Sequence, residues 1–429
     1  LGELQDLALP DLRVWVARIR KHVRGLLSEN EQGSRRRRLP QLQVFPTAGG
    51  SIVLNVSTSG IYAVDRPAEA LINRAAQGEW PDDESRDSEL LQELQKQGVF
   101  AVQPPPELPR ERPFTSLYLD ISSRCNLRCS YCFAEQGTYG FEGKLMSQDV
   151  GEKAIDLLLR ESGEAPKVQV TFFGGEPLLN HKLIPHLVGY GRAKSGILGK
   201  SIHFTVVSNG TLFSRKLVSA LDREHVAVQL SLDGPPDTHD RLRPDRHGAG
   251  TYRRVIRSIQ LLREGGIRPI GIRTTLVSSE PSPLEILKHI AELDVGSIKM
   301  EYVHPTLDRR APWSEKEAVW AKRAETELAD YFFQRIKERK PVPYANLIQR
   351  LLHLAGRRRF PVFCGAGRTL ISVTPDGLVF PCFRFADDRS RSVGTVFAGI
   401  QRDKLAGLLS HSVDDRESCR ACWARYLCG

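Results

Sequence analysis

The middle of the chain alternates between short apolar runs and longer segments in which apolar residues recur every three or four positions. The apolar runs are expected to be strands: Leu117–Ile121, Val168–Phe173, Ile202–Val207, Val226–Leu230, Ile270–Leu276 and Ser297–Val303. The segments between them are expected to be helices: Ala154–Arg160, Leu183–Ala193, Arg215–Leu221, Arg254–Arg263 and Leu284–Leu293. Near-continuous apolar strands alternating with helices indicate a parallel sheet covered by helices. The pattern therefore predicts an α/β fold, an open, partial (β/α)6 barrel over residues 114–305, with functional loops at the carboxyl ends of its strands.

A smaller module is predicted in the sequence that precedes this barrel. Residues 1–40 are expected to form an amphipathic helix and then a basic linker that contains Arg35–Arg38. Residues 41–108 show two strand patterns followed by two helix patterns: Leu42–Phe45, Ile52–Val56, Pro67–Ala76 and Ser88–Gln97. This order predicts a small winged-helix-like domain, joined to the barrel by a proline-rich linker.

Two further segments are predicted in the sequence that follows the barrel. Residues 306–360 are expected to be linker helices, a long one over Glu315–Lys340 and a shorter one over Leu347–Leu354. Residues 361–429 are expected to be a cysteine-rich domain that begins with a β-hairpin, Leu370–Val373 and Leu378–Phe380, around a turn at Asp376-Gly377.

Composition narrows the class of protein. The 429 residues are 41% apolar, and 61 basic against 51 acidic residues give a net charge of +10. No apolar run approaches the roughly 18 residues of a membrane span, so a soluble, cytoplasmic protein without a membrane partner is expected. The arginines are scattered along the chain, which disfavours nucleic acid as a partner, whereas a basic surface suits an acidic peptide. Eight cysteines without a secretory signal indicate a reducing compartment, in which thiols serve metals or catalysis.

The strongest chemical signal is the run Cys125, Cys129 and Cys132, a CxxxCxxC pattern directly after the first barrel strand. Three thiolates on one loop can hold three irons of a [4Fe-4S] cluster and leave the fourth iron open. A zinc site is a weaker alternative because it needs four ligands and commonly spaces them as CxxC pairs. A disulfide is weaker still in a reducing compartment.

Short polar loops follow the next strands. Gly174-Gly175-Glu176 comes after the second strand, Ser208-Asn209 after the third, and Ser231 and Asp233 after the fourth. Each loop alone is an ordinary turn, but all three would lie at one edge of a parallel sheet, beside the cysteines. Guanidinium groups suit carboxylates, so a carboxylate partner has three candidates: Arg241, Arg243 and Arg273.

These motifs, in this order, resemble those of the radical S-adenosylmethionine enzymes, including the aromatic Tyr131 before the third cysteine. The resemblance implies a [4Fe-4S] cluster on Cys125, Cys129 and Cys132, with S-adenosyl-L-methionine on its open iron. It implies that Gly174, Gly175 and Glu176 bind the cofactor's ammonium group. The cofactor's ribose hydroxyls and carboxylate would then contact Ser208, Asn209, Ser231, Asp233 and one of the arginines. Of the three arginine candidates, Arg243 is included among the predicted site residues.

The remaining cysteines are Cys364, Cys382, Cys419, Cys422 and Cys428. Their order resembles the SPASM extension, which implies two auxiliary [4Fe-4S] clusters. The resemblance assigns the first two cysteines to one cluster and the last three to the other. The family places further cysteines beyond the last one, so a truncated carboxyl end is expected. A zinc ribbon is the alternative for the CxxC pair taken alone.

Finer motifs, such as Leu145-Met146-Ser147 and Cys364-Gly365-Ala366-Gly367, resemble maturases that form thioether cross-links. These include the maturases of six-cysteine peptides and of the quinohemoprotein amine dehydrogenase small subunit. The resemblance implies a precursor peptide or small subunit, bound by the winged-helix-like domain, and an electron donor such as flavodoxin or ferredoxin. Sulfatase maturases place an aspartate where this chain has Phe383, which disfavours formylglycine formation. Two different functions also fit the cysteine pattern: carbon-carbon cross-linking of a peptide, and electron transfer by a non-catalytic iron-sulfur protein.

Overall fold

The computed structural model describes residues 41–428 except 82–84, 109–111, 279–280 and 304–312. The predicted amphipathic helix in residues 1–40 therefore lies outside the described residues. The described chain divides into two compact units. The first unit contains residues 41–108, 349–364 and 411–428, and the second contains the described parts of 109–348 and 365–410.

The second unit is built on one large sheet. Its strand order is β13-β12-β11-β10-β4-β5-β6-β7-β8-β9, and the strands from β10 through β4 to β9 pair in parallel. Six of these strands correspond to the predicted barrel strands: β4 (Ser116–Ser122), β5 (Lys167–Gly174), β6 (Ser201–Ser208), β7 (Ala227–Ser231), β8 (Gly271–Leu276) and β9 (Ser297–Tyr302). The predicted parallel α/β sheet is confirmed.

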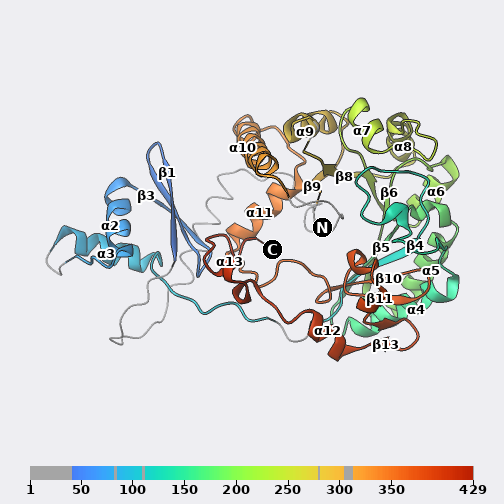
Figure 1. Ribbon diagram of the computed structural model, residues 1–429, viewed down its shortest axis with the longest axis horizontal. Helices are drawn as coiled ribbons and strands as arrows, with labels where there is room; N and C mark the ends of the chain where they lie inside the picture. Colours follow the sequence, from blue (N-terminus) through green and yellow to red (C-terminus); the bar gives the residue numbers. More distant parts are fainter. Residues whose placement is uncertain (1–40, 82–84, 109–111, 279–280, 304–312, 429) are drawn as a thin grey trace. The chain divides into compact units, whose positions relative to one another are not determined.

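Helices cover the outer face of this curved sheet, as Figure 1 shows. They are α4 (Gln148–Glu161), α5 (Leu183–Ile197), α6 (Arg215–Arg223), α7 (Pro236–Leu242), α8 (Tyr252–Glu264) and α9 (Pro283–Ala291). Leu157, Ile184 and Leu221 are fully buried beneath them, which matches amphipathic helices packed on apolar strands. The short helix α7 has no counterpart among the predicted elements.

The predicted C-terminal hairpin joins the barrel sheet. Strand β10 (Leu370–Val373) pairs in parallel with β4, and β11 (Leu378–Phe380) returns beside it. Two more short strands, β12 (Gly394–Thr395) and β13 (Gly399–Ile400), extend the sheet. The prediction of one separate domain over residues 361–429 is therefore corrected. Strand β10 covers the edge of β4, whose backbone groups would otherwise lack partners.

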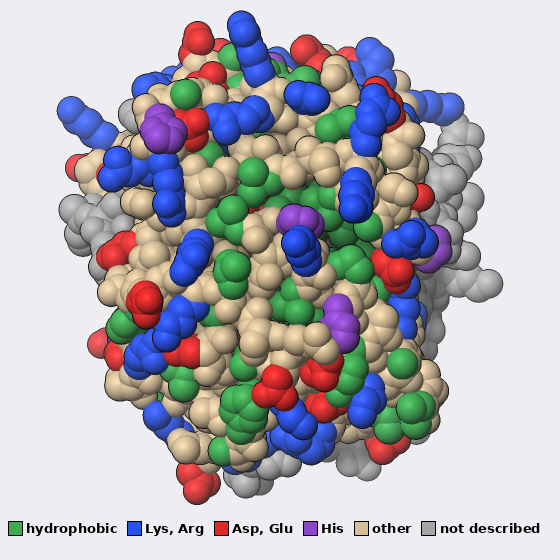
Figure 2. All heavy atoms as spheres, turned by 90° about the vertical axis from the view of Figure 1, so that its right-hand side faces the viewer, with side chains coloured by type: hydrophobic (Ala, Val, Ile, Leu, Met, Phe, Trp, Pro, Cys, Tyr) green, Lys and Arg blue, Asp and Glu red, His purple; other side chains and the backbone are tan. Residues whose placement is uncertain are grey.

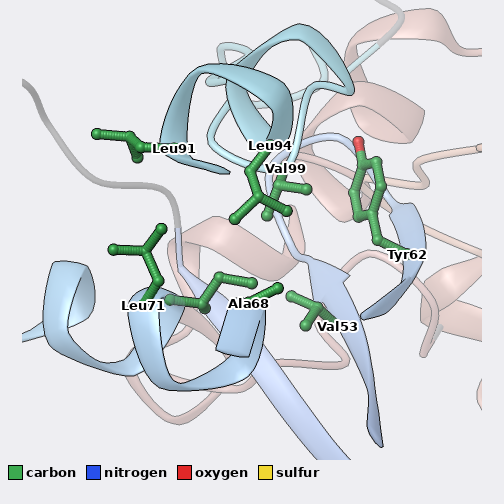
Figure 3. Packing of buried hydrophobic residues seen from close by; sticks show 8 residues of the cluster. Val53, Tyr62, Ala68, Leu71, Leu91, Leu94 and Val99 are labelled. Carbon is green, nitrogen blue, oxygen red and sulfur yellow. The ribbon is translucent and has the colours of Figure 1, made fainter. Parts of the chain in front are cut away.

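The first unit begins with an antiparallel sheet of β1 (Leu42–Thr47), β2 (Gly50–Asn55) and β3 (Gly60–Val64). Two helices follow, α2 (Arg66–Ala76) and α3 (Arg86–Lys96). Their apolar faces form one core with the sheet, as Figure 3 shows: Val53, Tyr62, Ala68, Leu71, Ile72, Leu91, Leu94 and Val99. The two predicted strands and two predicted helices are present, and β3 is an additional strand.

The end of the chain shares a second apolar cluster with this module. Val56, which follows β2, is buried together with Val413 and Tyr426. The Trp423 ring lies edge-on to Phe45 of β1, with ring centroids 5.2 Å apart. This segment contains the short elements η6 (Val413–Asp415) and α13 (Glu417–Arg420). The first unit is therefore assembled from three segments that lie far apart in the chain: 41–108, 349–364 and 411–428.

The two predicted linker helices are present as α10 (Glu315–Lys337) and α11 (Ala345–Ala355). On the face drawn in Figure 2, lysine and arginine side chains are interspersed with acidic and apolar ones and do not form one continuous field. Within the residues that the structure describes, no helix combines the length and apolar character needed to cross a bilayer.

Candidate active site

The cysteine loop leaves the carboxyl end of β4 through an irregularity in the strand. The register with β5 shifts between Asp120 and Ser122, and Ser122 N donates to Asp120 Oδ1 at 3.2 Å. Cys125 follows and is buried, whereas Cys129 and Cys132 are partly exposed. The three cysteines therefore share one loop at the carboxyl end of the sheet, where ligands bind in parallel α/β folds.

The glycine loop after β5 packs directly against the cysteine loop. Gly175 N donates to Ser122 O and Glu176 N donates to Arg124 O, both at 2.8 Å. A side chain at Gly174 would place its Cβ 2.1 Å from Asp120 Oδ1, and the φ of +131° also favours glycine. The two glycines thus permit a close backbone approach, and that approach orders the cysteine loop.

Glu176 joins two of the polar loops. Its buried carboxylate accepts hydrogen bonds from Leu178 N at 3.0 Å, Ser208 Oγ at 2.8 Å and Asn209 N at 2.8 Å. Burial raises the pKa of Glu176 to about 7, although these three hydrogen bonds oppose the shift. Because protein donors engage both carboxylate oxygens, Glu176 acts here as a strut between the β5 and β6 loops.

The strut places Asn209 beside the first cysteine. Asn209 Nδ2 lies 3.8 Å from Cys125 Sγ and donates to Asn126 Oδ1 at 2.9 Å, while Asn209 Oδ1 accepts from Thr211 Oγ1 at 2.7 Å. Leu127 N also donates to Cys125 Sγ, at 3.4 Å. Two N–H donors therefore lie beside this sulfur, where they would stabilise a ligated thiolate.

A second polar cluster lies beside the other end of the cysteine loop. Arg243 Nη1 donates to the Tyr131 hydroxyl, which in turn donates to Asp233 Oδ2. Arg243 Nη1 is also 3.6 Å from Asp233 Oδ2, and both side chains are nearly or fully buried. Thr275 N donates to Asp233 Oδ1 at 3.0 Å. The predicted residues Tyr131, Asp233 and Arg243 are thus brought together, and Ser231 lies at the end of the adjoining strand β7.

The thiols are held in a setting that suits metal ligation. Burial raises the pKa of Cys125 to about 12 and also raises that of Cys129, so both free thiols are protonated at neutral pH. A metal displaces such protons. Arg243 opposes the shift at Cys129, and Gln136 N donates to Cys132 Sγ at 3.3 Å. Positive charge and N–H donors stabilise ligated thiolates, so the donor set fits an iron-sulfur cluster.

No group of three His, Cys, Asp or Glu side chains within the described ranges encloses a site for a single metal ion.

The three candidate arginines have different surroundings. Arg273 Nη2 lies 3.4 Å from Glu301 Oε2, and Arg241 is exposed on α7. Arg243 is buried, and its Nε has no hydrogen-bond partner among the described residues. A buried donor without a partner is costly and marks a place for an acceptor such as a carboxylate. The structure therefore favours Arg243 over the other two as a ligand for an anionic group.

Half-buried aromatic rings line the sheet next to this site. Phe383 follows Cys382 and lies 4.6 Å from Phe173 and 5.0 Å from Tyr118, measured between ring centroids. Phe133, next to the third cysteine of the loop, lies 5.9 Å from Phe383. The position after Cys382 thus belongs to an aromatic cluster and carries no carboxylate.

The other cysteines are distributed over both units. Cys382 belongs to the second unit, and Cys364, Cys419, Cys422 and Cys428 belong to the first. All eight cysteines are free thiols in the structure. The assignment of five of them to two auxiliary clusters stays a prediction.

Two features of the site have no counterpart in the sequence-based prediction. Asp120 is a buried carboxyl whose Oδ2 has no partner among the described residues, and burial raises its pKa well above the usual value. Helix α7 carries the buried His239, which lies six residues after Asp233. The only sequence signals were an aspartate inside an apolar strand and a proline pair, Pro235-Pro236, at a possible helix start.

Comparison with known proteins agrees with this geometry. A family model described as the radical SAM superfamily matches residues 119–290. An uncharacterized protein of Methanocaldococcus jannaschii is 30% identical over 191 residues, 44% of this chain and 63% of that protein. A serine-type anaerobic sulfatase-maturating enzyme of Bacteroides thetaiotaomicron is 27% identical over 198 residues, 44% of this chain and 46% of that enzyme. The chain thus covers less than two thirds of either relative.

Solved structures share the fold over more of the chain. Native anSMEcpe with bound AdoMet has a TM-score of 0.62 at 22% identity, covering 73% of this chain and 88% of that one. Streptococcus suis SuiB bound to precursor peptide SuiA has a TM-score of 0.53 at 15% identity, covering 88% of this chain and 91% of that one. At such identities the likeness concerns the fold. Together with the family match and the cysteine loop at the sheet's carboxyl edge, it shows that this chain carries a radical S-adenosylmethionine domain over residues 119–290.

Proposed function

We propose that this chain is a radical S-adenosylmethionine peptide maturase that joins a cysteine sulfur to a carbon atom in a precursor peptide or small protein subunit. The observation that carries the proposal is the buried polar cluster of Tyr131, Asp233 and Arg243 beside a loop of three cysteines. Structural neighbours with bound AdoMet or bound peptide support the choice of cofactor and substrate class.

The chain's own residues would hold a [4Fe-4S] cluster and S-adenosyl-L-methionine. Cys125, Cys129 and Cys132 would ligate the cluster, and the free Nε of Arg243 would pair with the cofactor carboxylate. Glu176, already occupied by protein donors, would hold Ser208 and Asn209 in place instead of contacting the cofactor directly. When bound, the cluster and cofactor supply a 5′-deoxyadenosyl radical.

Thioether formation removes two hydrogens from the substrate. The carbon loses a hydrogen atom to the radical and the thiol loses a proton, so one electron must leave as the S–C bond forms. Cys364, Cys382, Cys419, Cys422 and Cys428 are proposed to hold the auxiliary clusters that accept this electron. Phe173, Phe383 and Tyr118 would face the substrate with an aromatic surface that excludes water.

The test is anaerobic reconstitution with iron, sulfide, S-adenosyl-L-methionine and a reductant such as flavodoxin or ferredoxin. The first readout is 5′-deoxyadenosine, and its absence from an iron-loaded protein would overturn the enzyme proposal. The second readout is the mass of a small cysteine-containing protein co-expressed with the chain. A loss of two hydrogens per cross-link is expected, with the linked cysteine resistant to alkylation. Formylglycine, or a carbon-carbon link that leaves the cysteine free, would overturn the thioether assignment.

A further inference from the structure

The segment that follows α7 holds the centre of the cysteine loop. Arg128 N donates to Pro244 O at 2.8 Å, and Ser130 N donates to Leu242 O at 3.0 Å. These two hydrogen bonds flank Cys129, so the backbone on both sides of that cysteine depends on where residues 242–244 lie. Arg243, between the two acceptors, directs its side chain to Tyr131.

A buried histidine fixes this segment. His239 is fully buried, and its Nδ1 accepts a hydrogen bond from Asp233 N at 3.2 Å. Because a backbone N–H can only donate, Nδ1 carries no proton, and the neutral ring has its proton on Nε2. Burial lowers the pKa of His239 to about 3, and the positive charge of Arg243 adds to the shift. The ring is therefore neutral at physiological pH.

The Nε2 proton continues the chain of hydrogen bonds. His239 Nε2 lies 3.1 Å from Thr251 Oγ1, and Thr251 Oγ1 donates to Arg243 O at 2.7 Å. Thr251 is also fully buried. One ring thus connects the backbone of Asp233 at one end with the backbone of Arg243 at the other.

We infer that His239 and Thr251 are positioning residues that lock the Asp233 loop and the Arg243 segment in the geometry that supports Cys129 and Tyr131. Their hydrogen bonds go to Asp233 N and Arg243 O, so they act through these two neighbours. The inference rests on the proposed function for its consequence: a misplaced Arg243 would neutralise the Cys129 thiolate less well and bind the cofactor carboxylate less well.

The test compares Thr251→Val, which keeps the shape and loses the hydroxyl, with Thr251→Ser, which keeps the hydroxyl. Iron and sulfide content, the midpoint potential of the cluster and the dissociation constant of S-adenosyl-L-methionine are measured on the reconstituted full chain. Thr251→Val is expected to weaken cofactor binding about two- to tenfold, the effect of one lost hydrogen bond. It should also lower the midpoint potential, because less positive charge faces the cluster. Thr251→Ser should restore both values.

His239→Asn is the second comparison and serves if the valine variant does not fold. An asparagine oxygen can still accept from Asp233 N but cannot reach Thr251, whose hydroxyl keeps its hydrogen bond to Arg243 O. This variant should therefore change both values in the same direction as Thr251→Val, by a smaller amount. Far-UV circular dichroism checks that the fold is retained. A midpoint potential and cofactor affinity equal to wild type in both variants would overturn the inference. That result leaves the proposed function intact, whereas a wild-type chain that binds iron but forms no 5′-deoxyadenosine overturns the proposed function alone.

Discussion

At the scale of single residues, the site contains a buried ion pair, Asp233 and Arg243, and a buried carboxyl group, Asp120, without a cationic partner among the described residues. Asp233 and Arg243 form a buried ion pair and share the Tyr131 hydroxyl. Asp120, five residues before the first cysteine, is buried; Ser122 N donates to its Oδ1, and its Oδ2 has no partner within the described part of the chain. Burying an uncompensated carboxylate is costly, so its protonated form is favoured.

Asp120→Asn tests this cost. The pKa of Asp120 is raised above its usual 3.8, first by burial and then by the charge of Asp376. A raised pKa means that the folded state binds the proton more tightly, so the wild type loses stability as the pH rises from 3.8 through the raised value. The asparagine variant, which stays neutral, should be about 1–2 kcal/mol more stable at pH 7.5 and equal at pH 4. Urea unfolding at both pH values measures the free energy of unfolding of each protein. A difference between variant and wild type that is the same at both pH values would contradict the raised pKa of Asp120.

Replacing Cys125, Cys129 or Cys132 by alanine should abolish cofactor cleavage, because two thiolates on this loop are too few to hold a [4Fe-4S] cluster. Cys382→Ala is the matched comparison, since that cysteine lies outside the loop. It should retain 5′-deoxyadenosine formation and lose the cross-linked product. Iron content, deoxyadenosine and peptide mass are the measurements. Peptide turnover by Cys382→Ala would refute its proposed role.

At the scale of elements, the loops at the carboxyl ends of the strands brace one another. Glu176 ties the β5 loop to the β6 loop, and the backbone of Gly175 ties it to the cysteine loop. Contacts between successive βα units thus order the site. Such preorganisation reduces the cost of arranging ligands on binding.

Glu176→Gln should break this bracing. The glutamine amide would turn an N–H toward protein donors, leaving a buried donor unpaired at a cost of about 2–3 kcal/mol. Glu142→Gln, an exposed acidic residue in the same unit, serves as the control and should change stability by about 0.5 kcal/mol or less. Differential scanning calorimetry compares them. Equal melting temperatures for the two variants would show that the hydrogen bonds of Glu176 do not stabilise the fold in this way.

The sequence was informative where the pattern is local. The alternation of apolar runs predicted six barrel strands to within one or two residues, since buried parallel strands are apolar on both faces. Helix α7 was missed because its seven residues are mostly polar. Strand β3 was missed because it begins at a glycine behind a Ser-Thr run. The motifs predicted which residues gather at the site, but the strut role of Glu176 and the backbone support of Cys129 depend on tertiary contacts.

At the scale of the whole molecule, the two units have separate cores, and both are discontinuous in sequence. In the first unit, Tyr426 closes the cluster with Val56 and Val413, and its hydroxyl donates to Asp414 Oδ1 at 3.0 Å. Arg359 lies over its ring, with the guanidinium carbon 5.0 Å from the centroid. A single aromatic ring therefore joins three segments of the first unit.

Tyr426→Ala should destabilise the first unit by about 3–5 kcal/mol, as expected for removal of a buried aromatic ring. Tyr426→Phe removes only the hydroxyl and should cost about 1 kcal/mol. Calorimetry of the alanine variant should show a lower melting temperature for the first unit and an unchanged melting temperature for the second. Cofactor cleavage by the barrel should persist. A single, uniformly shifted transition would indicate that the two units unfold together.

The interleaving of the units also bears on how this protein emerges from the ribosome. Residues 41–108 are synthesised early, but their partners at 349–364 and 411–428 leave the exit tunnel only after the whole barrel. The apolar surface around Val56 therefore stays without Val413 and Tyr426 while some 300 intervening residues are translated. Exposed apolar surface of this kind favours aggregation, so the early-made part of the first unit is vulnerable until residues 411–428 have been synthesised.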